Sequence, residues 1–297
     1  MGNGRRFHHK ALWLIIEGNL KRCMKYLATL CFILFFAVTQ SQVNKIEHFF
    51  ASSPKAEKLF EFFSKELELP VVWKYQSWGD FASGGVTLGN VAFELVTFKG
   101  ADTTSFNGIA LEPRHHMEEF EKELDKLGIA HDTIDNSNVS KDSTGALTGW
   151  SLSTPKDLLP YEANLFVCDY KKRQRVADNR KKGADKLKET NGGGLGVILM
   201  KEIVVATPEF KKYDERFAKL PGVVKEKDGL FLFSDGPALR LEQDHKNWIA
   251  KIVIKARSLK NAKTFLESKN LLGKVNANSI FILPAAIDGL AIELVEN

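Results

Sequence analysis

The sequence predicts an α+β fold of two tandem domains, each built from two βαβββ modules. Three observations support this prediction. An order of one strand, one helix and about three strands recurs four times, Gly89-Asn90 marks a tight hairpin inside the first copy, and Ser53-Pro54 and Thr207-Pro208 stand at the same point of the first and third copies. Such internal repetition indicates that one supersecondary unit has been duplicated.

The first copy begins with a strand over residues 45–51, followed by a helix whose apolar residues recur at three- and four-residue spacing. An extended run over residues 71–75 and the two arms of the hairpin follow. Gly89-Asn90 separates those arms, because glycine supplies the positive φ that two-residue turns require. The expected order is therefore strand, helix and three strands.

Glu94 lies in the middle of the second hairpin arm. Successive strand residues point to opposite faces, so Val91, Phe93 and Leu95 share one face and Glu94 belongs to the other. A bare carboxylate in that position is costly unless it is solvated, paired or bound to a cation. What Glu94 faces is thus the first functional question about this chain.

The other copies repeat the order with the same helical spacing. The second runs from Gly108 to Tyr170, the third from Lys201 to Leu241 and the fourth from Ile249 to Val295. Their helices are marked by apolar residues at Met117, Phe120, Leu124, Leu127; Phe210, Tyr213, Phe217, Leu220; and Leu259, Ala262, Phe265, Leu266.

Residues 1–41 are expected to be a leader, with a secretory signal peptide at residues 24–41. Met24-Lys25 precedes an apolar run that ends at Val38, and small residues follow it. The run is short for a bilayer span, so we expect export to the periplasm or medium, Met24 as the true start and no stable membrane insertion after cleavage. An uncleaved anchor is the alternative.

Removing the leader changes the charge of the protein. It holds six of the 42 lysines and arginines and one of the 37 aspartates and glutamates, which leaves 36 of each. A net charge of zero offers no argument for a nucleic-acid partner. Of the three cysteines only Cys168 remains, so the mature chain has no internal disulfide and depends on its core.

The predicted organisation is a first domain over residues 42–170, a basic linker arm over 171–195 and a second domain over 196–297. The arm is rich in lysine and arginine and ends in Asn191-Gly-Gly-Gly194, which favours a helix followed by a flexible glycine hinge. Because Asp178, Asp185 and Glu189 are interspersed, a solvated inter-domain helix is favoured over a grip on an anionic partner.

In its repeated modules the chain resembles the vicinal oxygen chelate superfamily, which includes the glyoxalases, bleomycin-resistance proteins and extradiol dioxygenases. The likeness is carried by Ile46-Glu-His-Phe-Phe, the helix after it and the stretch from Gly84 to Val96. It implies tandem glyoxalase-like domains, in which two modules curve a mixed sheet into a U around a cavity. It does not imply one reaction, because the superfamily hosts many.

The resemblance also implies a divalent-metal site, with ligands from the first and last strand of each module. Carried over by position, it gives His48 and Glu94 in the first module and Asp169 in the second, where Gly108 replaces a first-strand ligand. His, Glu and Asp suit a divalent ion, and three protein ligands leave room for substrate oxygens. The alternative is no metal, with His48 hydrogen-bonded in the cavity and Glu94 paired with a base.

In the second half the equivalent positions form a charge cluster of two acids and two bases: Glu202, Arg240, Lys251 and Glu293. Two cations would repel a metal, so we expect a degenerate copy without one. The expected pairs are Glu202 with Lys251 and Arg240 with Glu293.

Trp73, Trp78 and Trp150 are candidates for a substrate pocket, although packing within a sheet is the favoured alternative for such residues. Two functions of different class remain open. One is an exported, metal-dependent enzyme on a small oxygen-rich substrate, with Glu94 doubling as a catalytic base. The other is a non-catalytic protein that binds or sequesters a small molecule. The sequence names neither the ligand nor the oligomeric state.

Overall fold

The structure is a computed structural model that describes residues 43–296, apart from the side chain of Asn44. The predicted leader and signal peptide lie outside these residues. Within them, no helix combines the length and apolar character needed to cross a membrane.

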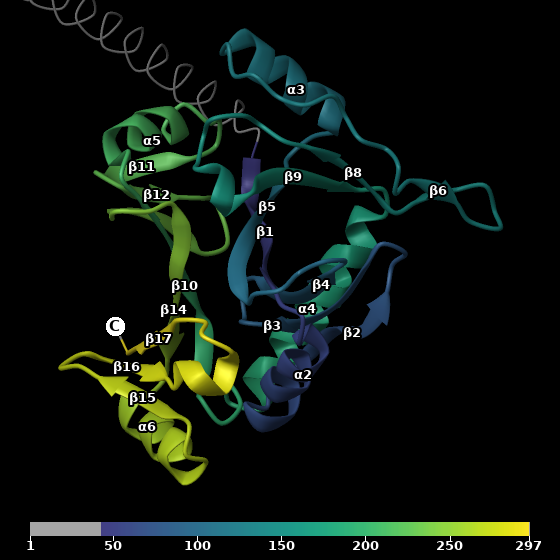
Figure 1. Cartoon of the computed structure of the whole chain (residues 1–297). Coiled ribbons are helices and arrows are strands. Elements are labelled where there is room, and N and C mark those ends of the chain that lie inside the picture. The colour runs from purple at the N-terminus through teal and green to yellow at the C-terminus, as the bar shows by residue number, and fades with distance from the viewer. Residues whose placement is uncertain (1–42, 297) are drawn as a thin grey trace, which may run out of the picture. The chain divides into compact units, whose positions relative to one another are not determined.

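The first half follows the predicted order (Figure 1). Its elements are β1 (Val43–Ser52), α2 (Ala56–Glu61) continued by a π-helical segment (Phe62–Glu66), β2 (Val71–Ser77), β3 (Phe81–Thr87), β4 (Ala92–Phe98), β5 (Ser105–Pro113), α3 (Met117–Lys126), β6 (Ser140–Lys141), β7 (Leu147–Thr148), β8 (Trp150–Ser153), a 3-10 turn (Tyr161–Ala163) and β9 (Leu165–Tyr170).

The second half repeats it after a long connecting helix, α4 (Arg173–Glu189). Its elements are β10 (Val197–Thr207), α5 (Phe210–Phe217), β11 (Val224–Lys227), β12 (Leu230–Leu232), β13 (Ala238–Gln243), β14 (Trp248–Ala256), α6 (Leu259–Ser268), β15 (Leu272–Val275), β16 (Ser279–Ile282), a 3-10 turn (Pro284–Ile287) and β17 (Ile292–Val295).

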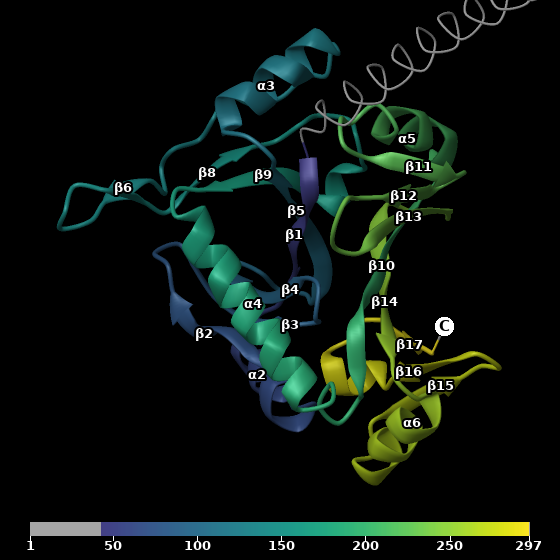
Figure 2. The same ribbon diagram turned by 180° about the vertical axis from the view of Figure 1, so that it is seen from behind.

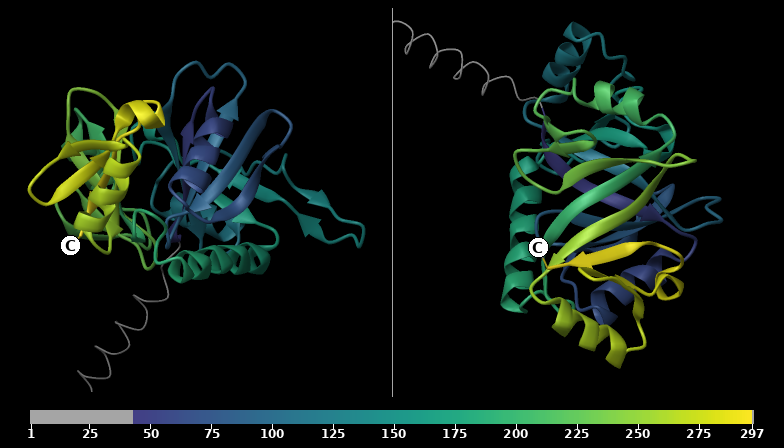
Figure 3. Two further views of the ribbon diagram at one scale, coloured as in Figure 1. Left: turned by 90° about the horizontal axis from the view of Figure 1, so that it is seen from below. Right: turned by 90° about the vertical axis from the view of Figure 1, so that its left-hand side faces the viewer.

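The strands of each half form one curved mixed sheet. The first has the order β2-β3-β4-β1-β5-β9-β8, and the second has the order β11-β12-β13-β10-β14-β17-β16-β15. In both, the opening strands of two modules pair antiparallel at the centre, β1 with β5 and β10 with β14, and each pairs parallel with the closing strand of its own module. Figure 3 shows β10 and β14 side by side in one view and the two halves next to each other in the other.

The α+β prediction of tandem, curved mixed sheets is confirmed, with one departure in the second module. There β6 and β7 form a two-stranded hairpin of their own, so only β8 and β9 follow α3 in the main sheet. The hairpin projects away from the sheets (Figure 1).

The core lies between each sheet and its helices. In the first module α2 packs on β3 and β4, and the rings of Phe49 and Phe93 stack at 4.7 Å with Phe63 edge-on to Phe93 at 5.0 Å. These three residues come from β1, β4 and the π-helical segment. The face of β4 that carries Phe93 is therefore the helix side, and Glu94 points the other way, as the alternation predicts.

The hairpin tip at Gly89-Asn90 joins the two halves. Gly89 has φ +92°, and the amide side chain of Asn90 donates to the Met200 carbonyl and accepts from the Met200 backbone N–H, both at 3.0 Å. The turn that the sequence marks thus also fixes the first sheet against β10.

The basic arm is a helix, as predicted, but it is not simply solvated. Figure 2 shows α4 lying diagonally across the first half, where it contacts β2, β3 and β9. Leu187 and Gly183 on this helix are buried. The glycines after it also pack closely, because a Cβ on Gly194 would lie 2.1 Å from the Phe265 ring of α6. A flexible hinge is therefore not what this segment provides.

Candidate functional site

A cavity of about 470 Å³ occupies the concave face of the first sheet, opposite α2. Strands β1, β3, β4 and β9 form its floor, and α4 contributes Val176, Asn179 and Arg180 to its wall. Aromatic side chains make up much of the lining: Phe50, Trp73, Trp78, Phe81, Phe98, Trp150, Phe166 and Tyr170. The predicted U-shaped sheet thus encloses an apolar pocket that α4 closes from the side.

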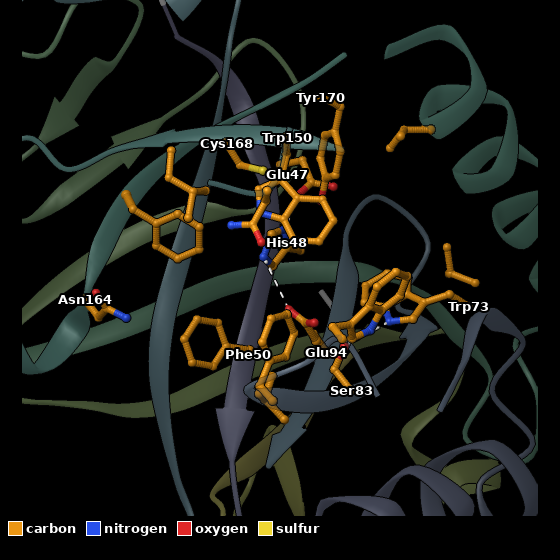
Figure 4. Close-up of a pocket in the computed structure, with 18 of the residues that line it drawn as sticks. Glu47, His48, Phe50, Trp73, Ser83, Glu94, Trp150, Asn164, Cys168 and Tyr170 are labelled. Carbon is orange, nitrogen blue, oxygen red and sulfur yellow. Dashed lines mark hydrogen bonds and ion pairs between the residues drawn. The ribbon is translucent and has the colours of Figure 1, made fainter. Parts of the chain in front are cut away.

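His48 and Glu94 meet at the floor of this cavity (Figure 4). Nε2 of His48 lies 3.4 Å from Oε2 of Glu94, and their side chains are only 8% and 14% exposed. Glu94 pairs across the parallel β1–β4 ladder with Phe50, two residues beyond His48. His48 and Glu94 thus lie diagonally across the two strands, and this diagonal brings together two residues that the sequence separates by a whole module.

Glu47 is the neighbour of His48 that the sequence pattern misses. Strict alternation would place it on the helix side, but the β1–β5 register shifts between Ile46 and His48. Such a bulge lets two successive side chains share one face. Glu47 is therefore buried in the cavity wall, where its carboxylate contacts Nδ1 of His48.

Arg180 of α4 completes this polar group. Its guanidinium contacts the Glu47 carboxylate and donates to Oε2 of Glu112 at 2.7 Å. The Tyr170 hydroxyl donates to Glu47 at 3.3 Å, and the Arg180 guanidinium lies 5.8 Å from the centre of the Tyr170 ring. The basic run of α4 predicted a charged helix, but only the packing of α4 shows which of its bases turns inward.

Burial changes the acidity of the cavity's groups. It raises the pKa of Glu94 from 4.5 to about 7, an effect that a hydrogen bond with Ser83 partly offsets. Burial also raises the pKa values of Cys168 and Tyr170 well above their usual ranges, so both are protonated at neutral pH. Glu94 is thus a carboxyl group that changes protonation near neutral pH.

Asp169 does not reach the cavity. Its side chain is 2% exposed on the other face of β9, where it accepts from Nε of Arg173 at 2.8 Å and from the backbone N–H of Met117 at 3.3 Å. Its neighbours in the strand, Cys168 and Tyr170, line the cavity instead. Asp169 caps the start of α3 and holds α4, so the ligand role predicted for it is wrong.

The strand register identifies which residue of β9 occupies the ligand position that was predicted for Asp169. Glu94, Arg240 and Glu293 each pair with the residue two beyond their module's first-strand position. In the second module that rule leads from Gly108 to Ala110, whose partner is Phe166. The last-strand position of the second module is therefore Phe166, an aromatic residue that lies three residues before Asp169.

Gly108 is equally unable to offer a ligand. The ring of Phe50 lies directly over it, and a Cβ at this position would come within 1.8 Å of Phe50 Cε1. The Phe50 and Phe166 rings lie 6.2 Å apart and fill this side of the cavity.

The donor set does not fit the predicted metal centre. His48 and Glu94 are placed together, the other two family positions are Gly108 and Phe166, and no described group of three His, Cys, Asp or Glu residues is arranged to hold an ion. Three protein ligands are what catalytic zinc-type sites use. The remaining acid near His48 is Glu47, which is already occupied by Arg180.

The three predicted pocket tryptophans do line the cavity. Trp73 lies over Gly85 and directs its indole N–H toward Ser83 Oγ at 3.4 Å. Trp78 and Trp150 meet edge-to-face at 6.0 Å, from the loop after β2 and from β8.

The charge cluster of the second half pairs differently from the expectation. Nε and Nη2 of Arg240 donate to the two carboxylate oxygens of Glu202 at 2.5 and 2.8 Å, and Lys251 donates to Glu293 at 2.7 Å. The predicted partners, Glu202 with Lys251 and Arg240 with Glu293, are therefore wrong. Each pair forms inside one module, along the same diagonal that joins His48 to Glu94, because neighbouring parallel strands bring these positions closest.

No protein-family model matches the chain, and no curated protein matches it. Solved structures do. A hypothetical protein from Staphylococcus aureus has a TM-score of 0.55 at 11% identity, with 85% of this chain and 99% of that chain covered. The 2,3-dioxygenase LapB from Pseudomonas sp. KL28 has a TM-score of 0.55 at 12% identity, with coverage of 87% and 93%.

A variant of homoprotocatechuate 2,3-dioxygenase from B. fuscum is similar to the same degree, with a TM-score of 0.54, 11% identity and coverage of 87% and 72%. At these identities the likeness shows the fold alone. The shared fold is the arrangement of βαβββ modules in curved mixed sheets that the sequence resemblance implies.

Proposed function

We propose that this protein binds a small molecule with an aromatic or otherwise apolar body in the cavity of its first half. The observation that carries the proposal is the concave, ring-lined space with the buried His48–Glu94 pair at its floor. Ligand pockets combine such apolar walls with a few polar groups that fix orientation, and about 470 Å³ lies within their usual range.

The sequence leaves two function classes open, a metal-dependent enzyme and a non-catalytic binding protein. Binding requires only the cavity and its lining, which the site provides. A metal-dependent enzyme would need a third ligand, whereas Gly108 and Phe166 present no donor atom. The likeness to 2,3-dioxygenases supports a cavity in this part of the fold but does not supply that ligand. Binding is therefore the proposed function, and sequestration of the ligand is its simplest form.

The neutral fluorescent probe N-phenyl-1-naphthylamine tests the proposal. We expect saturable binding with one probe per chain, because a neutral aromatic molecule buries its apolar surface against the rings of the cavity. Leu152→Trp, which adds bulk inside the cavity lining, should abolish binding. Leu147→Trp is the matched control, because Leu147 is half exposed on β7 outside the cavity, and it should leave binding unchanged.

Two outcomes would overturn the proposal. One is a parent protein that shows no saturable binding of this probe or of a panel of neutral aromatic compounds. The other is equal loss of binding in Leu152→Trp and Leu147→Trp, which would place the probe outside the cavity.

Proton transfer to or from the bound ligand is a second candidate, favoured by the pairing of Glu94 with an oriented imidazole. Glu47 contacts Nδ1 of His48, which leaves Nε2 toward Glu94 and the cavity. A buried carboxylate with a pKa near neutrality suits a general base. In this role Glu94 would take a proton from an acidic C–H of the ligand.

The ring opening of 5-nitrobenzisoxazole tests this candidate with a neutral aromatic probe. A base removes the C3 proton while the N–O bond breaks, and the product is a cyanophenolate that absorbs visible light. The rate should rise with pH, level off above about pH 7 and disappear in Glu94→Gln. A rate that Glu94→Gln leaves intact would exclude Glu94 as the base.

Export through residues 24–41 is a separate proposal that the sequence supports. It would place the pocket in the periplasm or outside the cell. N-terminal sequencing of the natively produced protein tests it, with a start near Gln42 as the expected result and a retained leader as the contrary one.

A further inference from the structure

We infer that the ligand carries a cationic nitrogen, which the Glu94 carboxylate and the surrounding aromatic rings would bind together. This inference rests on the proposed function and adds the chemical class of the ligand. It comes from the charges of the cavity, from the pairing of the equivalent residues elsewhere in the chain and from the position of Glu94 among the rings.

The cavity offers no cation to an anionic ligand. Among the described residues, Arg180 is the only lysine or arginine that lines the cavity, and its guanidinium is shared between two carboxylates, Glu47 and Glu112. An entering carboxylate or phosphate would therefore meet acidic groups without a free partner. A positively charged ligand would instead meet carboxylates of opposite charge.

The four modules provide an internal comparison for Glu94. In the third module Glu202 has Arg240 as its partner, and in the fourth module Glu293 has Lys251. Glu94 stands at the position of Glu293 and His48 at that of Lys251, so here the partner of the carboxylate is an imidazole, at 3.4 Å. Where the other two modules have a lysine or an arginine, this module has a histidine, and both His48 and Glu94 line the cavity.

The rings around Glu94 suit the same charge. Figure 4 shows its carboxylate between Phe50 and Trp73, below His48. Aromatic faces attract cations through their quadrupole, most strongly for indole and where water is excluded. A carboxylate and rings on several sides together form a site for an ammonium or an alkylated nitrogen, the kind of cation that is weakly hydrated and readily leaves water.

Two probes of nearly equal shape test the inference. Phenyltrimethylammonium carries the charge and tert-butylbenzene does not, so their affinities separate the charge from the fit. Binding can be followed by isothermal titration or by tryptophan fluorescence, because Trp73, Trp78 and Trp150 line the cavity. We expect the cation to bind at least about tenfold more tightly than the neutral probe.

Glu94→Gln should remove most of that difference and leave the affinity for tert-butylbenzene unchanged. Glu293→Gln is the matched control, because Glu293 occupies the equivalent position in the fourth module, outside this cavity. It should preserve the preference for the cation. The melting temperature of each variant shows whether it is folded.

The outcomes separate this inference from the proposed function. If tert-butylbenzene binds as tightly as phenyltrimethylammonium, or if Glu94→Gln keeps the preference, the inference is wrong and the binding function stands. If neither probe binds and N-phenyl-1-naphthylamine does not bind either, the binding function itself fails.

Discussion

Nε2 of His48 lies 3.4 Å from the carboxylate of Glu94, along a diagonal between parallel strands that recurs in two further modules. There the diagonal joins Glu202 to Arg240 and Lys251 to Glu293, both as ion pairs. One backbone arrangement thus holds two neutralised pairs in the second half and a titratable pair at the floor of a cavity in the first.

The raised pKa of Glu94 predicts how stability depends on pH. Its folded-state pKa is about 7 and its unfolded value 4.5, so the folded protein retains a proton that the unfolded chain releases. The stabilisation from this group is complete below about pH 4.5 and is lost as pH rises through about 7. The shift corresponds to about 3 kcal/mol. Glu94→Gln should therefore be more stable than the parent at pH 8 and similar to it near pH 5.

Urea denaturation at the two pH values measures this difference. Glu293→Gln should behave in the opposite way at pH 8, because it breaks the ion pair with Lys251 and gains nothing. Parallel stability profiles of the parent and Glu94→Gln would show that Glu94 ionises freely in the folded protein.

Phe166→His should supply a third metal ligand in the cavity of the first half. Phe166 occupies the last-strand position of the second module, and its ring centre lies 5.8 Å from that of His48. An imidazole there would join His48 and Glu94 as a third ligand, which is the number that open metal centres use. We expect this variant to retain Co²⁺ after dialysis, with the visible absorption of a bound ion, and the parent to release it.

Asp169→Asn is the control for that experiment. Because Asp169 binds Arg173 and the backbone of Met117 on the other face of β9, its loss should lower stability without changing metal retention. A parent protein that retains stoichiometric Co²⁺, and loses it in Asp169→Asn, would contradict this assignment.

Arg240→Met should destabilise the protein more than Lys251→Met. The Glu202 side chain is 11% exposed and is held at both oxygens, so removing Arg240 leaves a buried carboxylate unpaired, at a cost of about 3 kcal/mol. The Glu293 side chain is almost as buried, at 13% exposed, but Lys251 holds it through one hydrogen bond instead of two, so the loss of Lys251 should cost less, about 2 kcal/mol.

Thermal or urea unfolding ranks the two variants. The double change of Glu202→Leu with Arg240→Met should recover much of the loss, since it removes the stranded charge. Equal effects of the two single changes would mean that the second hydrogen bond of Arg240 adds nothing to stability.

Gly108→Ala tests why the second module carries no side chain at its first-strand ligand position. The added methyl group would overlap the Phe50 ring, and overpacking of this kind costs about 1–3 kcal/mol. In a Phe50→Ala background the same change should cost much less, because the obstacle is gone. A double-variant cycle measures the coupling between the two changes. Additive effects would show that the Phe50 ring is not the reason why position 108 requires a glycine.

Much of the candidate site could be predicted from the sequence because it depends on local periodicity. The alternation along residues 91–96 places Glu94 opposite Phe93, and Gly89-Asn90 fixes the turn before it. The match between modules also assigns Glu202, Arg240, Lys251 and Glu293, since the spacing within those modules is preserved. These features require only that a strand has a period of two and that a turn needs a suitable residue.

The tertiary structure decided the rest. A bulge in β1 brings Glu47 beside His48, and the packing of α4 turns Arg180 inward. Neither can be predicted from the two-residue alternation of side chains along a strand. The long excursion between α3 and β9, with the β6–β7 hairpin, hides the register that selects Phe166 instead of Asp169. Pairing across strands is set by hydrogen-bond register over long distances in the chain, and a one-residue shift exchanges the two faces of a strand. For that reason the sequence alone determined which residues carry charge, and only the folded sheets determined which of them meet.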